Sequence, residues 1–158
     1  HARDKDAVVA SMLVCELAAS LKTQGKNILD ALEDVYNIYG HYLAYVQSIE
    51  LTGADAMEKA AKMMSDLRND VPACVGGAEV TVVKDYQAGT ATELRTGTKN
   101  PIGLPCSNVV ELILGDRGIV IVRPSGTEPK IKFYFTAVGQ TKAEAQALLD
   151  ACVHQMTK

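Results

Sequence analysis

A short stretch near the end of the chain, VRPSGTEPKIKFYF, places several polar donors between two apolar segments with strand character. Arg123 offers a planar guanidinium, Ser125 and Thr127 offer hydroxyls, and Lys130 and Lys132 offer ammonium groups. A phosphate dianion needs several convergent donors and at least one cation. An arginine fork beside neutral donors and a lysine meets that need. The stretch is therefore a candidate phosphate-binding loop, although a solvated turn has a similar composition.

The backbone chemistry of this stretch favours a tight turn between two strands. Gly126 lets the chain turn with its amide exposed, and Pro129 directs Glu128 toward an extended conformation before the next strand begins. Lys130 and Lys132 are two positions apart, so both should point to the same face of that strand. The carboxylate of Glu128 would repel a phosphate, and we expect it to turn away or to pair with a lysine.

The composition describes a chain that can bury a core. Its 158 residues are 47% hydrophobic and 22% charged, and the net charge of −3 argues against broad nucleic-acid binding. No apolar run is long enough to cross a membrane. The chain begins with a histidine and a densely charged segment, which is unlike a signal peptide, and we expect it to be a piece of a longer protein.

The cysteines carry little information about a site. The four cysteines are widely scattered and form no CxxC pair, which argues against zinc ligation. Free cysteines of this kind are typical of a reducing compartment, so the expected location is cytoplasmic.

Hydrophobic spacing predicts an α+β protein. Residues 1–40 read as a helical hairpin, with Asn27 capping the second helix, and this hairpin should be marginal unless it packs on another body. Residues 41–158 read as a mostly antiparallel sheet of four to five strands with two helices on one face. Thr141 and Glu144 predict a capping box at the last helix. The expected elements are strands at 41–51, 78–86, 108–114, 118–122 and 130–138 and helices at 54–69 and from 141 onward. Residues 87–107 read as a long polar connection that is functional or disordered.

Three segments resemble one enzyme family. RPSGTEPKIKFYF is similar to the C-terminal phosphate-binding loop of the α-D-phosphohexomutases, the family of phosphoglucomutase and phosphomannomutase. HARDKDA (1–7) resembles the segment after that family's sugar-binding loop, and GLPCSNVVEL (103–112) is similar to its bacterial phosphoglucomutase branch. The resemblance implies that residues 1–40 end the third domain of such an enzyme and that residues 41–158 form its fourth, TATA-box-binding-protein-like domain.

The resemblance also implies an activity for the parent enzyme. Members of the family move a phosphoryl group from a phosphoserine to a hexose phosphate, and a bisphosphate turns round in the cleft before the other phosphate returns to the serine. A Mg²⁺ ion sits beside the phosphoserine. The fourth domain binds the phosphate that is not reacting. The parent is most similar to a phosphoglucomutase, which converts glucose 1-phosphate to glucose 6-phosphate, and the implied partners are a hexose phosphate and the upstream domains of the same chain.

Site residues follow from the resemblance position by position. The implied phosphate contacts are Arg123, Ser125, Gly126, Thr127, Lys132 and Lys130. Lys5 matches a lysine near the reacting groups, where it could help proton transfer, although a solvated lysine in a first helical turn explains it too. His1 and Arg3 are weaker candidates.

Several parts of the family's machinery are missing from this sequence. No serine is followed by His-Asn, no Asp-Gly-Asp magnesium loop occurs, and the glutamates that read sugar hydroxyls should lie before His1. The acids of Asp4-Lys5-Asp6 are better explained by the start of a helix than by a metal. We therefore expect no metal ligands in this chain and no catalysis by it alone. The sequence does not choose among hexose phosphates or give an oligomeric state.

Two other hypotheses compete with the enzyme fragment. The first is a free-standing anion- or RNA-binding α+β module in which Phe133 and Tyr134 stack on bases. Neighbours in a strand face opposite sides, so these two rings should not share a face. The second is a purely structural domain in which the loop is a solvated turn.

Overall fold

The computed structural model describes residues 4–126 and 128–158. The chain divides into two compact units, His1–Gly40 and His41–Lys158. This division falls where the sequence changes from helical spacing to strand composition.

The first unit consists of two helices with local capping signals. α1 spans Ala7–Thr23 and α2 spans Ile28–Tyr39. The predicted cap at Asn27 is confirmed, because its side chain and that of Asp30 form a reciprocal capping box. Gly25, with φ of 72°, supplies the left-handed turn that ends α1, as expected.

Most apolar side chains of this unit are exposed. Leu21 is buried in α1, and α2 has no buried residue. The exposed apolar residues are Val8, Met12, Leu13, Val14, Leu17, Ile28, Leu29, Leu32, Val35, Ile38 and Tyr39. Among the residues that the structure describes, no single helix is long and apolar enough to cross a membrane; α1 and α2, bent by 90°, meet the length and composition limits only as a pair.

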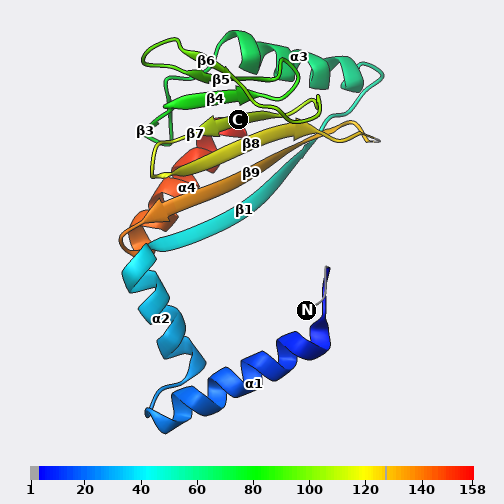
Figure 1. Cartoon of the computed structure of the whole chain (residues 1–158). Coiled ribbons are helices and arrows are strands. Elements are labelled where there is room, and N and C mark those ends of the chain that lie inside the picture. The colour runs from blue at the N-terminus through cyan, green and yellow to red at the C-terminus, as the bar shows by residue number, and fades with distance from the viewer. Residues whose placement is uncertain (1–3, 127) are drawn as a thin grey trace. The chain divides into compact units, whose positions relative to one another are not determined.

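The second unit is built on an antiparallel sheet of seven strands in the order β1-β9-β8-β7-β4-β5-β6 (Figure 1). The strands are β1 His41–Glu50, β4 Val82–Asp85, β5 Thr90–Glu93, β6 Lys99–Pro101, β7 Val110–Ile113, β8 Gly118–Pro124 and β9 Lys130–Gly139. A separate two-stranded sheet pairs β2, Cys74–Val75, with β3, Ala78–Glu79. Because every pairing is antiparallel, directly opposite residues share a face of the sheet.

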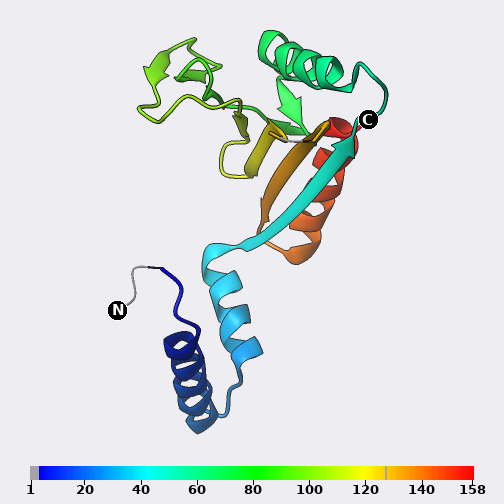
Figure 2. The same ribbon diagram turned by 90° about the vertical axis from the view of Figure 1, so that its right-hand side faces the viewer.

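Both helices of this unit cover the same face of the sheet. α3, Ala56–Asn69, packs on β8 and β9, and α4, Lys142–Met156, packs on β9 and β1 (Figures 1 and 2). The core lies between them and the sheet, where Met64, Leu148, Ile131 and Phe133 belong to one buried cluster. We call the other side, which neither helix covers, the open face.

The α+β class with helices on one face is confirmed, but the sheet is longer than expected. Residues 87–107 are not one long loop, because β5 and β6 form a hairpin inside them. These strands are short and largely polar, so they lack the apolar alternation that would reveal them. The expected strand at 78–86 is interrupted, because Val80 donates to Ala73 whereas Thr81 donates to Ile113 across the main sheet.

The structure confirms the predicted GDRG turn and shows a variant of the capping box predicted at α4. The GDRG hairpin is confirmed, and Gly118, with φ of 148°, is required there because a Cβ would collide with the carbonyl oxygen of Thr136. At α4, Thr141 accepts from the amide of Glu144 at 3.2 Å. The carboxylate of Glu144 accepts from the amide of Gln140 at 3.0 Å, one residue before the position that a capping box requires.

The sheet core should dominate the stability of the second unit. Leu112 is 0% exposed, whereas Leu104 is 60% exposed. We expect Leu112→Ala to lower the free energy of unfolding by about 2–5 kcal/mol, because it leaves a cavity in the core. Leu104→Ala, the matched control, should change it by less than about 0.5 kcal/mol. Urea denaturation followed by circular dichroism measures both, and equal effects would contradict this placement of the core.

Candidate phosphate-binding site

The candidate loop is the tip of the β8–β9 hairpin. Arg123 lies opposite Lys132, Pro124 lies opposite Ile131, and the amide of Ser125 donates to the carbonyl oxygen of Lys130 at 2.8 Å. The hairpin therefore closes at Ser125, and the described residues Gly126, Glu128 and Pro129 lie at its tip. Thr127, one of the predicted phosphate contacts, lies outside the described residues.

A second strand holds the loop from the other side. β1 pairs with β9 along its whole length, so that Ser48 lies opposite Lys132. Past the end of this ladder, the amide of Leu51 donates to the carbonyl oxygen of Pro129 at 2.8 Å. The last residue of the tip is thus fixed to β1 by a backbone hydrogen bond. The loop has rigid strands on both sides, which suits a site that must hold a ligand in one orientation.

Arg123 and Lys132 lie side by side on the open face. Along β9 the odd-numbered residues are buried under the helices, so the expectation that Lys130 and Lys132 share the opposite face is confirmed. Arg123 is exposed and Lys132 is half-buried. Within the described residues, neither side chain forms an ion pair or a hydrogen bond. The two cations are therefore available to an anion at the root of the loop.

Lys130 is already engaged. Its Nζ lies 2.6 Å from Oε2 of Glu128, and its side chain is only 21% exposed. The hydrogen bond and charge of Lys130 lower the pKa of Glu128, and the same contact with Glu128 raises the pKa of Lys130. The repulsive carboxylate is thus neutralised by pairing, one of the two outcomes expected from the sequence. This pairing also removes Lys130 from the free cations that the sequence offers.

Ser125 offers a ligand fewer backbone donors than expected, and Gly126 leaves open space beside the loop. The amide of Ser125 is committed to Lys130, so only its hydroxyl remains for a ligand. Gly126 is exposed and does not adopt a positive φ, so the turn does not require a glycine for conformational reasons. A Cβ at Gly126 would meet no atom within 4 Å. The glycine therefore keeps the space above the backbone free for a ligand.

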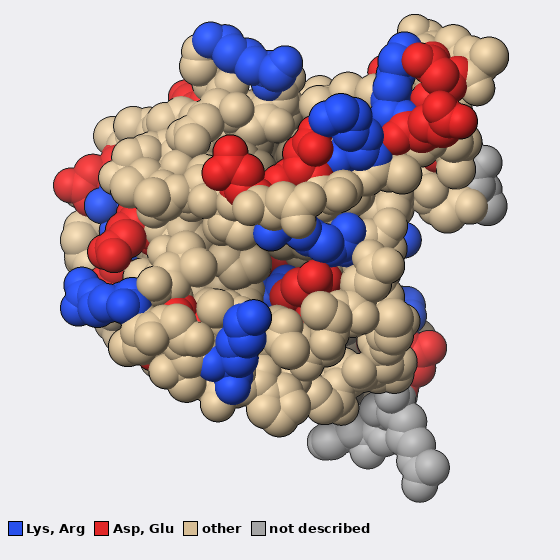
Figure 3. All heavy atoms as spheres, turned by 90° about the horizontal axis from the view of Figure 1, so that it is seen from above, with Lys and Arg blue, Asp and Glu red and all other residues tan. Residues whose placement is uncertain are grey.

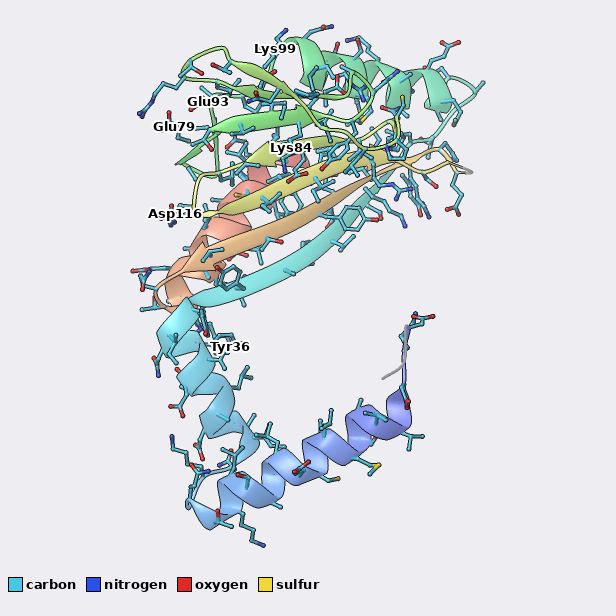
Figure 4. The ribbon with its side chains drawn as sticks, in the orientation of Figure 1. Tyr36, Glu79, Lys84, Glu93, Lys99 and Asp116 are labelled. Carbon is cyan, nitrogen blue, oxygen red and sulfur yellow. The ribbon has the colours of Figure 1, made fainter. Side chains whose placement is uncertain are left out.

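A polar network on the open face was not anticipated from the sequence. Lys84, Glu111 and Ile121 lie opposite one another on β4, β7 and β8. Oε1 of Glu111 accepts from Lys84 Nζ at 3.1 Å, and Oε2 accepts from the hydroxyl of Tyr86 at 2.6 Å. Lys84 is labelled among the strands in Figure 4. The signal that could have revealed this network is the single acid within the apolar run VVELIL.

The network keeps a buried carboxylate satisfied near the candidate site. Glu111 is 8% exposed, and an unpaired charge at that depth would be costly. The hydrogen bond to Glu111 is the main cause that raises the pKa of Tyr86 to about 12. The carboxylate therefore has a hydrogen-bond donor on each oxygen, and it lies one strand away from Arg123.

The first unit holds the remaining predicted residues. The side chain of Lys5 is 92% exposed and pairs with Asp4 at 2.8 Å. Asp6 caps α1 by accepting from the amides of Val8 and Val9, which confirms the helix-start reading of that acid. His1 and Arg3 lie outside the described residues. Across residues 4–126 and 128–158, no three His, Cys, Asp or Glu side chains are grouped so that they could hold a metal ion.

The aromatic residues of β9 do not form a stacking surface for bases. Phe133 is 3% exposed and stacks on Phe135 in the core with ring centroids 6.2 Å apart, whereas Tyr134 lies on the open face. The expectation that Phe133 and Tyr134 face opposite sides is confirmed. On the surface seen in Figure 3, basic and acidic side chains are interspersed. The surface seen from above therefore lacks the single-sign basic patch that nucleic-acid binding favours.

The chain is similar to one family across most of its length. Residues 55–155 match the family described as "Phosphoglucomutase/phosphomannomutase, C-terminal domain". Phosphoglucomutase from Staphylococcus aureus is 38% identical over 132 residues, which cover 84% of this chain and 24% of the relative. Phosphoglucomutase from Staphylococcus haemolyticus is 33% identical over 134 residues, 85% of this chain and 24% of the relative. The chain thus spans about a quarter of the length of these relatives.

The fold is similar to a solved structure. The open form of pp63/parafusin, a phosphoglucomutase from Paramecium, superimposes with a TM-score of 0.62 at 15% identity, covering 99% of this chain and 26% of that one. At this identity the likeness supports the fold alone.

The Tyr86–Glu111 contact should be visible in a pH titration. We expect the absorbance of Tyr86 to titrate near the raised pKa of about 12, and Glu111→Gln should return the pKa toward 10. Because the folded-state pKa is raised, the stabilisation is complete below pH 10 and is lost as the pH rises through about 12. Ultraviolet titration against a Tyr86→Phe control measures the shift. An unchanged titration in the Glu111 variant would contradict the network.

Proposed function

Because this chain belongs to the phosphoglucomutase/phosphomannomutase family, we propose that it is the C-terminal part of a phosphohexomutase and binds the non-reacting phosphate of a hexose phosphate. The observation that carries the proposal is the pair Arg123 and Lys132, two adjacent cations without a partner among the described residues. They lie at the root of a hairpin loop whose other charged groups neutralise each other. Ser125, Gly126, Thr127 and Lys130 complete the proposed contacts, and Lys130 also pairs with Glu128.

The proposed reaction belongs to the whole parent enzyme. We propose interconversion of glucose 1-phosphate and glucose 6-phosphate through an enzyme phosphoserine and a bisphosphate intermediate. In that reaction the loop would hold the phosphate remote from the phosphoserine. Fixing the remote end converts binding energy into orientation at the reacting end. The same contacts would serve both orientations of the bisphosphate, because a guanidinium and an ammonium group recognise a phosphate whichever carbon bears it.

The two units fit a division between domains of the parent. We propose that residues 1–40 belong to its third domain and that residues 41–158 form its fourth. The exposed apolar side chains of α1 and α2 support this, because a helix pair with so little buried surface needs further protein to pack on. The core of the second unit supports its assignment as a domain in its own right.

Magnesium binding and proton transfer would involve parts of the proposed enzyme other than the phosphate-binding loop. The described residues do not offer a metal-ligand cluster, so the proposed Mg²⁺ ligands belong to the part of the parent outside this chain, and no step proposed here runs through the ion. Lys5 remains a proposed proton-transfer residue, and its exposed ammonium group, which pairs with Asp4, could move to a substrate without losing a buried contact.

A cytoplasmic location completes the proposal. Cys15, Cys74, Cys106 and Cys152 are all free thiols. Exposed free thiols are typical of a reducing compartment. The proposed substrate, a phosphorylated sugar, is a metabolite that such a compartment would supply.

Removing the guanidinium tests the proposed phosphate contact. We expect Arg123→Ala to weaken binding of glucose 6-phosphate about 10- to 100-fold, since a hydrogen bond to a charged group contributes about 1.5–3 kcal/mol. Arg95→Ala removes an exposed arginine from the β5–β6 turn and is the matched control, with no expected effect. Titrations followed by NMR chemical shifts give both affinities. Equal affinities for the wild type and the Arg123 variant would reject the phosphate site and favour a solvated turn.

The chain alone should not turn over substrate. It lacks the phosphoserine sequence, so we expect no conversion of glucose 1-phosphate to glucose 6-phosphate above the uncatalysed rate. An assay coupled to glucose-6-phosphate oxidation measures this, with a full-length phosphoglucomutase as positive control. Turnover by the purified chain would show that the reacting groups lie within these 158 residues, contrary to the proposal.

A further inference from the structure

We propose that the hydroxyl of Ser48, on β1, donates a hydrogen bond to the phosphate held by Arg123 and Lys132. The inference rests on the proposed function, which it deepens by adding a side chain from a distant segment. Neither the loop sequence nor its flanking residues point to Ser48, because β1 precedes the loop by nearly half of the chain.

The register of three strands places these side chains in one row. Arg123 on β8 lies opposite Lys132 on β9, and Lys132 lies opposite Ser48 on β1. Directly opposite residues in antiparallel pairs share a face and have Cβ atoms about 4.5–5.5 Å apart. Ser48 is therefore a neighbour of the free lysine, on the open face and on the side away from Arg123. An anion held by the Lys132 ammonium group close to the sheet surface would lie within reach of this hydroxyl.

Ser48 is exposed and its hydroxyl is available. Within the part of the chain that the structure describes, the hydroxyl has no hydrogen-bond partner. The neighbouring Gln47 has its side chain engaged, because it accepts from the hydroxyl of Tyr45 at 2.9 Å and donates to the carbonyl oxygen of Ser48 at 3.3 Å. No rearrangement of an existing hydroxyl contact is needed for Ser48 to bind a ligand.

The adjacent row shows why the residue type at position 48 matters. There Glu50 lies opposite Lys130, and both Glu50 and Glu128 raise the pKa of that lysine. Lys130 is thus surrounded by carboxylates and is not a free cation. An acid at position 48 would engage Lys132 in the same way, and an apolar residue such as Val46 could not donate to a ligand. The charge of Lys132 already acts on Glu128, and serine adds a neutral donor beside Lys132 without adding a further carboxylate.

The position of Ser48 relative to the loop is fixed by backbone hydrogen bonds on both sides of it. β1 and β9 stay in register from His41 and Gly139 to Glu50 and Lys130, and the Leu51–Pro129 hydrogen bond extends the contact past Ser48. A slip of one residue would move Ser48 to the helix-covered face and expose core side chains, so the alignment is strongly specified. Ser48 is therefore a preorganised part of the proposed site.

Three substitutions at one position test the assignment. Ser48→Ala should weaken binding of both inorganic phosphate and glucose 6-phosphate about 10-fold, the loss of one hydrogen bond to an anion. Ser48→Asp should weaken it more, because a carboxylate would pair with Lys132 and repel the phosphate. Ser48→Thr keeps the hydroxyl and should retain most of the affinity.

Ala44→Asp is the matched control for the acidic variant. Ala44 is exposed on the same strand and the same face, opposite Thr136, farther from the loop. It adds the same charge to the open face and should leave phosphate affinity within about twofold of wild type, because exposed charges beyond about a Debye length are screened. NMR titrations at matched salt give each affinity, and thermal unfolding confirms that each variant is folded.

The outcomes separate this inference from the proposed function. If Arg123→Ala weakens binding but Ser48→Ala does not, or Ser48→Asp and Ala44→Asp act equally, the role of Ser48 is overturned and the phosphate site stands. If Ser48→Ala affects glucose 6-phosphate but not inorganic phosphate, the hydroxyl contacts the sugar, which also overturns the inference. If the wild type binds neither probe, the proposed function and this inference both fail.

Discussion

The pairing of β9 with a strand on each of its edges is the constraint on which the second unit depends. Its backbone hydrogen bonds to β8 and β1 fix which side chains face the helices and which face away. Ile131 and Phe133 enter the core, and the intervening Lys132 is placed on the open face next to Arg123. Because side chains along a strand alternate between its two faces, the register that buries Ile131 and Phe133 also places Lys132 on the open face.

The local charge arrangement at the loop differs from the overall charge of the chain. The chain is acidic, with a net charge of −3, yet the root of the loop presents two unpaired cations. Two nearby carboxylates are compensated by cations or donors: Glu128 by Lys130, and the buried Glu111 by Lys84 and Tyr86. An anion at the proposed site would therefore meet two positive charges, and its recognition would depend on short-range contacts more than on the net charge of the chain.

The two units show different relations between local signals and burial. α1 and α2 have good caps and clear helical spacing, yet their apolar side chains are mostly exposed. In the second unit, similar signals coincide with a contiguous core. Caps and apolar spacing determine that a segment is helical, whereas burial of its apolar side chains needs a partner surface. If residues 1–40 belong to another domain of the parent, as proposed, the rest of that domain would supply this surface.

The sequence by itself determined the features that depend on near neighbours: the Asn27 and Thr141 caps, the GDRG hairpin, the alternation along β9 and the donor-rich loop. Only the tertiary structure decided that Lys130 is paired while Lys132 is free, that Ser48 lies beside Lys132, that Glu111 is held by Lys84 and Tyr86, and that residues 87–107 contain two strands. The physical reason is that caps and alternation arise from contacts within a few residues. Register joins strands far apart in the chain, and no local pattern specifies which residues it sets opposite each other.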